Sequence, residues 1–347
     1  MSVSRAINRR TVLAGGAVAL AAPYLARPAR ADAALRLLTW EGYAEDAWVK
    51  PFEEKTGAKV NITYVGSADE MFAKMQGSKG ADFDLATFDT SAFKRYLDAG
   101  LLAPVDASKL TAGGNLQPEF RDVAAIKRDG NVYGVPFAWG SLPLIYSKPA
   151  FPDSPPDWNA MWNPDFAQQI IMQDDANNCI TLGAIVVGVK DPFNLTDADF
   201  EAVKAKLIEQ KPLLLTYFAG FDEGVTIFAQ SDVKLMYSMG EPQLPALKKK
   251  GVDAALTIPP AGAIGWLDCW TVSSGAQNMD LVYKWLDACL DPAVGAYLSE
   301  KLGYGNTTNP PANQASGVTY GDKLIWLQTP ENIEKRVQIW NEVKAAG

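Results

Sequence analysis

Residues 35–43 of the chain read LRLLTWEGY, an apolar run followed by a tryptophan, an acid, a glycine and a tyrosine. The run Leu35–Thr39 has the composition of a strand buried on both faces, and the glycine is a turn residue. A helical pattern then covers Glu45–Lys55 and stops before Gly57. A strand that passes through a short loop into a helix is the first part of a βαβ unit and predicts a parallel sheet.

The same alternation continues along the chain, with strands predicted at Lys59–Val65, Phe83–Thr87, Leu213–Phe218, Val233–Met239, Asp253–Pro259 and Gly265–Val272. Predicted helices cover Asp69–Met75, Ser91–Asp98, Asp197–Gln210, Glu223–Gln230, Gln243–Lys250, Asp280–Leu290, Val294–Lys301 and Pro330–Ala345. Two extended apolar segments, Val135–Trp139 and Ala263–Leu267, lie between two groups of elements. This α/β pattern is compatible with two lobes joined by two crossovers, or with one large α/β domain.

The first 31 residues have a different composition from the rest. They contain five arginines and no acidic residue, an apolar run over Thr11–Ala26, and small residues around Ala29-Arg30-Ala31. This order is typical of a signal peptide. The segment Asn8-Arg9-Arg10-Thr11-Val12-Leu13 favours twin-arginine export, although two arginines also occur in ordinary secretory signals. We therefore expect an exported protein whose mature chain does not insert into the membrane.

Composition excludes several classes of site. The 347 residues include no histidine, which excludes a Ser-His-Asp triad, a Cys-His pair and a zinc site built on imidazole. The formal net charge is −8, and loss of the arginine-rich first segment would make the chain more acidic still. Such a charge does not suit nucleic acid and does suit a cationic ligand. Cys179, Cys269 and Cys289 allow one disulfide at most, and we expect no functional cysteine, metal or cofactor.

The most informative motif is Gly265-Trp266-Leu267-Asp268-Cys269-Trp270, in a segment predicted to be extended. Alternation along a strand places Trp266 and Asp268 on the same side. An indole face beside a carboxylate can bind an ammonium ion through cation–π attraction and a charge-assisted hydrogen bond. The motif is also compatible with a core tryptophan and an aspartate that caps a loop.

Acids and aromatics occupy several other predicted strand ends, where parallel sheets bind their ligands. Trp40, Glu41 and Tyr43 follow the first strand, and Asp89 follows the third. Asp175 precedes an apolar helix, and Glu241 comes directly before Pro242. Each acid also has an explanation as a helix cap or an acid of a first helical turn. Helix capping does not explain the aromatics beside them.

These motifs give the chain a resemblance to the polyamine-binding proteins (spermidine/putrescine type) of ABC importers, which are type II periplasmic binding proteins. The matching segments span nearly all of the mature chain: LTWEGY at 38–43, FDLA at 83–86, VPFAWG at 135–140, WNAMW at 158–162, DDA at 174–176, GWLD at 265–268 and LGY at 302–304. The resemblance implies an aromatic box for the methylene chain of the ligand, here Trp40, Tyr43, Trp266 and Tyr304. It implies carboxylates for the amino groups at Asp268, Asp175 and Glu241.

The chain departs from the family pattern in three places. Asn178 stands where relatives have an acid, and Asp89 and Ser91 replace a serine and tyrosine pair. Ser238 or Met239 replaces a tryptophan near the end of the strand Val233–Met239. These changes leave the particular amine open.

We therefore predict a two-lobed type II periplasmic binding protein with its ligand cleft between the lobes. Lobe 1 is expected to comprise residues 32–138 and 268–313, and lobe 2 residues 139–267 and 314–347. The expected function is capture of a small cationic amine, such as putrescine or spermidine, for an ABC permease by a monomer that is not an enzyme. A zwitterion such as a γ-amino acid is an alternative ligand. An exported hydrolase or lyase that uses paired carboxylates is a less favoured alternative.

Overall fold

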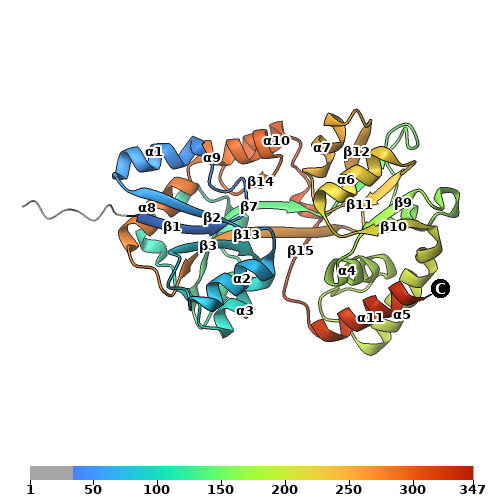
Figure 1. Cartoon of the computed structure of the whole chain (residues 1–347), viewed down its shortest axis with the longest axis horizontal. Coiled ribbons are helices and arrows are strands. Elements are labelled where there is room, and N and C mark those ends of the chain that lie inside the picture. The colour runs from blue at the N-terminus through green and yellow to red at the C-terminus, as the bar shows by residue number, and fades with distance from the viewer. Residues whose placement is uncertain (1–33, 347) are drawn as a thin grey trace, which may run out of the picture.

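The computed structural model of the protein describes residues 34–346 (Figure 1). The predicted signal peptide, residues 1–31, lies outside this range. The described chain folds around two sheets that lie at opposite ends of an elongated molecule, as Figure 1 shows. This arrangement confirms the predicted two-lobed α/β fold.

The first sheet has the strand order β14-β7-β13-β3-β1-β2, and β4 and β15 also pair with β13. Its strands are β1 (Ala34–Thr39), β2 (Lys59–Tyr64), β3 (Leu85–Asp89), β4 (Leu102–Ala103), β7 (Gly134–Ser141), β13 (Ala263–Ser273), β14 (Gly305–Asn306) and β15 (Leu324–Trp326). The helices of this lobe are α1 (Asp46–Thr56), α2 (Ala68–Gly77), α3 (Phe93–Asp98), α8 (Met279–Cys289), α9 (Pro292–Tyr297) and α10 (Pro310–Ala315). The predicted βαβ start is confirmed, because β1 pairs in parallel with β2 and with β3.

The second sheet has the order β10-β9-β11-β8-β12. Its strands are β8 (Leu144–Ser147), β9 (Ile170–Gln173), β10 (Leu214–Phe218), β11 (Leu235–Tyr237) and β12 (Ala254–Thr257). Helices α4 (Ala176–Val187), α5 (Asp197–Gln210) and α11 (Ile333–Ala345) pack together at one side, and α6 (Phe221–Gln230) and α7 (Gln243–Lys249) at the other (Figure 1). Helix α4 is apolar nearly all round because it packs against α5, α11 and the inner end of β13.

Three segments connect the lobes, where the sequence predicted two. The predicted crossovers are the continuations of β7 and β13, which pair antiparallel with each other in the first sheet. The third connection follows β15 and leads to α11 in the second lobe. Pairing within the first sheet includes residues 139–141, 263–267 and 324–326, which the predicted boundaries assigned to lobe 2. The predicted and observed boundaries differ because the last residues of β7 and the first residues of β13 extend past the other strands of the first sheet and still pair with each other.

Some local predictions were wrong at the ends of elements. The predicted helix Val294–Lys301 is α9 followed by a π-helical turn over Leu298–Leu302. After this turn, Asn309 caps α10, and Pro310 and Pro311 occupy its first turn, where no backbone N–H is required. A hairpin turn at Asp129-Gly130, where both residues have positive φ, joins the short strands β5 (Lys127–Arg128) and β6 (Asn131–Val132).

Buried charge and buried thiols stand out in the two cores. Asp84 is almost fully buried in the first lobe and accepts hydrogen bonds from the backbone N–H and the guanidinium of Arg36. All three cysteines are free and buried, in α4, β13 and α8. Within residues 34–346, no helix is long and apolar enough to cross a bilayer, and no cluster of acidic or thiol side chains could hold a metal ion.

Candidate functional site

A cleft of about 300 Å³ lies between the lobes, where the connections leave the first sheet. It brings together six of the nine side chains that the sequence singled out: Trp40, Tyr43, Asp89, Trp266, Asp268 and Tyr304. Four further residues complete its lining, namely Leu142, Asn178, Ile264 and Leu327. We refer to this cavity as the cleft.

The position of the cleft follows from the topology of the sheets. Trp40 and Tyr43 come directly after β1, and Asp89 is the last residue of β3, so both parallel strands present their carboxyl ends to the cleft. From the second lobe, β9 leads into the first turn of α4, which contributes Asn178. Gly42 makes the first of these loops possible, because its φ of +89° is a conformation that residues with a Cβ atom rarely adopt.

Asp268 is the most buried acid of the cleft, with 7% of its surface exposed. Its Oδ2 atom accepts a hydrogen bond of 2.7 Å from the hydroxyl of Tyr43. Burial and the nearby charge of Asp89 raise the pKa of Asp268 to about 8, although the Tyr43 hydrogen bond opposes the shift. The carboxyl group of Asp268 therefore binds a proton more strongly than that of an ordinary aspartate.

Asp89 lies directly opposite Asp268 on the neighbouring strand. Its Oδ1 atom accepts hydrogen bonds from the backbone N–H of Ser91 at 2.8 Å and from the Ser91 hydroxyl at 2.5 Å. Burial raises the pKa of Asp89 despite these hydrogen bonds. The capping explanation of Asp89 is thus correct, and the same side chain also lines the cleft.

The aromatic side chains of the cleft contact one another edge to face. The rings of Trp266 and Tyr304 have centroids 5.3 Å apart at 81°, and those of Tyr43 and Tyr304 are 6.1 Å apart at 86°. Tyr43 is held from behind by Phe137 at 5.3 Å. Such contacts fix the orientation of the rings before a ligand enters, so little side-chain entropy is lost on binding.

Glu241 is not among the side chains that line the cleft, although the sequence placed it in the site. It is buried between the lobes, where its Oε1 atom accepts hydrogen bonds from the Ser141 N–H, the Ser141 hydroxyl and the Tyr320 hydroxyl. Its Oε2 atom is buried without a hydrogen-bond partner. Burial raises the pKa of Glu241, against the effect of these hydrogen bonds. Glu241 thus joins the end of β7 to the segment before β15.

Glu41 and Asp175 also do not line the cleft. Glu41 is exposed at the surface. The Asp175 carboxylate accepts a hydrogen bond of 2.7 Å from the Asn178 N–H and so caps α4. For Asp175 the capping explanation accounts for the observed contacts.

Among the lining residues that sequence reasoning did not select, Ile264 lies within the predicted crossover Ala263–Leu267, and Leu142 comes shortly after the predicted crossover Val135–Trp139. The predicted crossovers could have indicated both residues, since the cleft lies where these crossovers leave the sheet. Leu327 had no such signal, because the short strand β15 before it was not predicted.

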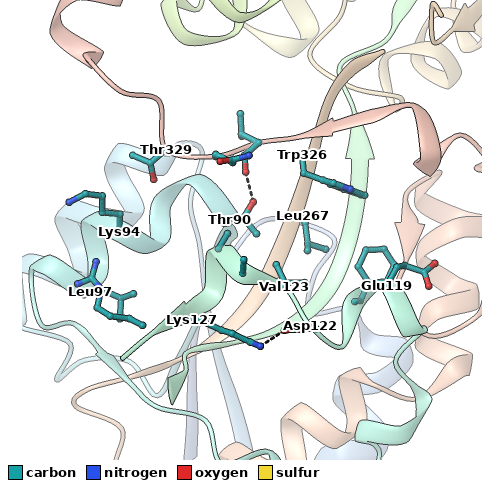
Figure 2. Close-up of a pocket in the computed structure, with 16 residues that line it drawn as sticks. Thr90, Lys94, Leu97, Glu119, Asp122, Val123, Lys127, Leu267, Trp326 and Thr329 are labelled. Carbon is teal, nitrogen blue, oxygen red and sulfur yellow. Dashed lines mark hydrogen bonds and ion pairs between the residues drawn. The ribbon is translucent and has the colours of Figure 1, made fainter. Parts of the chain in front are cut away.

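A larger cavity, of about 630 Å³, lies on the other side of the third connection (Figure 2). Leu327 lines both cavities, and Leu267 faces this one while its neighbours Trp266 and Asp268 face the cleft. The Thr90 hydroxyl donates a 2.7 Å hydrogen bond to the Leu327 carbonyl, which Figure 2 shows as a dashed line. Lys94 and Lys127 at this cavity form ion pairs with Asp98 and Asp122. We call it the rear cavity, and its paired charges distinguish it from the unpaired acids of the cleft.

The chain is similar to several known proteins. A family model described as "Bacterial extracellular solute-binding protein" matches residues 47–323. The chain is 26% identical over 319 residues to the spermidine/putrescine-binding periplasmic protein of Salmonella typhimurium, covering 91% of this chain and 89% of that one. It is 24% identical over 369 residues to a putrescine-binding periplasmic protein of Escherichia coli, covering 98% and 99%.

The fold is also similar to a solved structure, that of a spermidine/putrescine ABC transporter substrate-binding protein from Streptococcus pneumoniae. The TM-score is 0.80 and the sequence identity 21%, over 90% of this chain and 99% of that one. This likeness confirms the two-lobed fold predicted from the sequence.

Proposed function

Because the chain belongs to the bacterial extracellular solute-binding proteins, we propose that it captures a small cationic amine in the cleft and delivers it to the permease of an ABC importer. The observation that carries the proposal is a pair of carboxylates, Asp89 and Asp268, at the carboxyl end of the first sheet. No lysine or arginine of residues 34–346 lines the cleft beside them. The ligand itself is the cation that such a site requires.

The remaining lining suits an amine on an apolar stem. Trp40, Trp266 and Tyr304 offer ring faces and edges to methylene groups, and Leu142, Ile264 and Leu327 add aliphatic surface. An ammonium beside these rings gains cation–π attraction in addition to its hydrogen bonds to carboxylate. Relatives of the chain include spermidine- and putrescine-binding periplasmic proteins, which supports the same ligand class and a periplasmic location.

A zwitterion fits the cleft less well. The carboxylate of an amino acid or γ-amino acid usually binds to an arginine or another cation, and the described lining has neither. Asn178 is the polar side chain that the second lobe contributes, and its amide already donates a 3.0 Å hydrogen bond to Gln173 Oε1. A hydrolytic function has no support from the family, whose members bind solutes.

Binding is proposed to favour a closed arrangement of the lobes by contacts to both of them. The three connections lie beside the cleft, so residues that contact the ligand and residues that bend are neighbours in sequence. Trp266 and Asp268 belong to β13, and Leu327 to the third connection. Glu241 is proposed to position the end of β7 and the segment before β15, and Asp175 to position α4. Glu41 is proposed to have no contact with the ligand.

Residues 1–31 are proposed to direct export, with Arg9 and Arg10 as a twin-arginine signal. Fusion of this segment to a reporter that folds before export would test the route. Arg9→Lys together with Arg10→Lys should abolish export, because twin-arginine recognition requires both guanidinium groups, whereas an ordinary secretory signal needs only positive charge.

The central experiment is a thermal-shift screen of residues 32–347 against diamines, polyamines, monoamines and γ-amino acids. The protein is first unfolded, dialysed and refolded, so that no co-purified ligand remains. Amines should raise the midpoint in proportion to the logarithm of their concentration, as mass action requires. A shift by γ-amino acids alone, or by none of the compounds, would refute amine binding.

A further inference from the structure

On the basis of the proposed amine binding, we propose that Asp89 and Asp268 together hold one primary ammonium group and share one proton when the cleft is empty. Binding of the ammonium then expels this proton to solvent. It follows that the cleft selects primary over quaternary ammonium ions, although its aromatic rings would accept both.

The geometry of the pair supports a single shared site. Asp89 on β3 and Asp268 on β13 are direct partners in the antiparallel register. Partners of this kind project from the same face of a sheet with Cβ atoms about 5 Å apart. Both carboxylates line the cleft, so one ammonium group can approach the two at once.

Each carboxylate has one oxygen engaged and one free. Asp89 Oδ1 accepts from Ser91, and Asp268 Oδ2 accepts from Tyr43. Within residues 34–346, neither Asp89 Oδ2 nor Asp268 Oδ1 receives a hydrogen bond from the protein. A primary ammonium has three N–H groups, so it can donate to both free oxygens and keep one donor for another partner.

The charges around the pair require a proton in the empty cleft. No ion pair in the described part of the chain includes Asp89 or Asp268. The titratable groups that face Asp268 from neighbouring elements are Tyr43, after β1, and Tyr304, before β14, and both remain neutral because burial raises their pKa. Glu241 approaches the Trp266 ring at Gly140, and its charge helps to raise the pKa of Tyr304. Two adjacent, partly desolvated carboxylates without a cation hold one proton between them.

Binding exchanges one proton of the carboxyl pair for one ammonium group. The free protein holds one protonated and one ionised carboxyl group, and the ligand arrives as a protonated amine. In the complex, both carboxylates are ionised and the ammonium keeps all of its protons, so one proton leaves to solvent for each ammonium bound. The pair with its ammonium then has a net charge of −1, the same as the pair with its proton.

The selectivity follows from the hydrogen bonds. A quaternary ammonium has no N–H group and cannot satisfy the free carboxylate oxygens, which would then be buried without a partner. An aromatic box by itself attracts quaternary ammonium ions well. Discrimination between the two ion types therefore depends on the carboxylate pair and not on the rings.

Calorimetry with a matched pair of ligands tests the proposal. 1-Aminobutane and butyltrimethylammonium are titrated into the refolded protein at pH 7 in two buffers with different ionisation enthalpies. We expect release of nearly one proton per 1-aminobutane, and at least about tenfold weaker binding of the quaternary ion, because a hydrogen bond to a charged group contributes about 1.5–3 kcal/mol. Binding of 1-aminobutane without proton release, or equal binding of both ions, would overturn the proposal but leave amine capture intact.

Two variants assign the proton to the pair. Asp89→Asn removes one carboxylate and should reduce proton release at pH 7 while 1-aminobutane still binds, because the charge of Asp89 no longer raises the pKa of Asp268, although burial still does. Asp106→Asn is the matched control, because Asp106 Oδ1 accepts from the N–H and the hydroxyl of Ser108 just as Asp89 Oδ1 accepts from Ser91, but Asp106 does not line the cleft, and this variant should release as many protons as the native protein. Undiminished proton release by Asp89→Asn would refute the shared site. Failure of every amine to bind the native protein would refute the proposed function itself.

Discussion

Replacement of Asp268 by asparagine should stabilise the ligand-free protein and at the same time weaken its binding of amines. Asp268 is 7% exposed, and its pKa is raised from 3.8 to about 8 by burial and by the charge of Asp89. The folded state therefore binds a proton that the unfolded state has released throughout the range between these two values. Stability of the native protein must fall as the pH rises through this range.

The magnitude follows from the shift. Each pH unit between the two pKa values costs the native protein about 1.4 kcal/mol, so at pH 7 the retained proton lowers the free energy of unfolding by roughly 4 kcal/mol. Asparagine has nearly the same shape and does not titrate, and its side-chain oxygen can still accept the Tyr43 hydrogen bond. Asp268→Asn should thus be more stable than the native protein by a margin that grows from near zero at pH 4 to a few kcal/mol at pH 7.

Urea unfolding of refolded, ligand-free protein at pH 4, 5.5 and 7 measures this margin. Asp84→Asn is a control of opposite sign, because Arg36 and the Gln277 N–H lower the pKa of Asp84 in spite of its burial. That variant should lose stability most at neutral pH, and its deficit should shrink as the pH falls. An Asp268→Asn margin that does not change with pH would show that the native carboxyl group is ionised, and would refute the reasoning.

Two further predictions concern the region between the lobes. Gly140→Ala should lower the free energy of unfolding by about 1–3 kcal/mol and should weaken amine binding, because the added Cβ atom would lie 2.4 Å from the Trp266 ring and 2.7 Å from Glu241 Oε2. Urea unfolding measures the first effect and calorimetry the second, and unchanged affinity would mean that amine binding does not depend on the present position of Trp266. Tyr320→Phe should destabilise the protein by about 1.5–3 kcal/mol through loss of a hydrogen bond to the Glu241 carboxylate, and equal stability of the variant and the native protein in urea would show that another donor replaces the hydroxyl.

Much of the fold could be predicted because local signals agreed with the final packing. Helix α5 begins and ends as predicted, since Thr196 and Asp199 form a capping box before an amphipathic pattern. Strands β8, β9 and β15 were missed for a physical reason. They are three or four residues long and buried or nearly so, and such short runs have no period that separates strand from loop.

The site could be predicted in type but not in arrangement. Trp266 and Asp268 were assigned to one side of a strand by alternation alone, and the lining of the cleft includes both. That Asp268 faces Asp89 depends on the register between β13 and β3, which is set by packing far along the chain. The surroundings of Glu241 could not be predicted, because its partners, Ser141 and Tyr320, belong to segments that are distant from it in the sequence.

The burial of the three cysteines has a practical consequence for measuring motion between the lobes. Cys179, Cys269 and Cys289 are at most 2% exposed, and burial raises the pKa of each thiol well above its ordinary value. Maleimide dyes react with exposed thiolates, so the native chain should remain unlabelled. A cysteine introduced at exposed Lys50 on α1 and another at exposed Glu209 on α5 would then be the reactive pair. Fluorescence energy transfer between two dyes at these positions can follow opening and closing without removal of any native side chain from the cores.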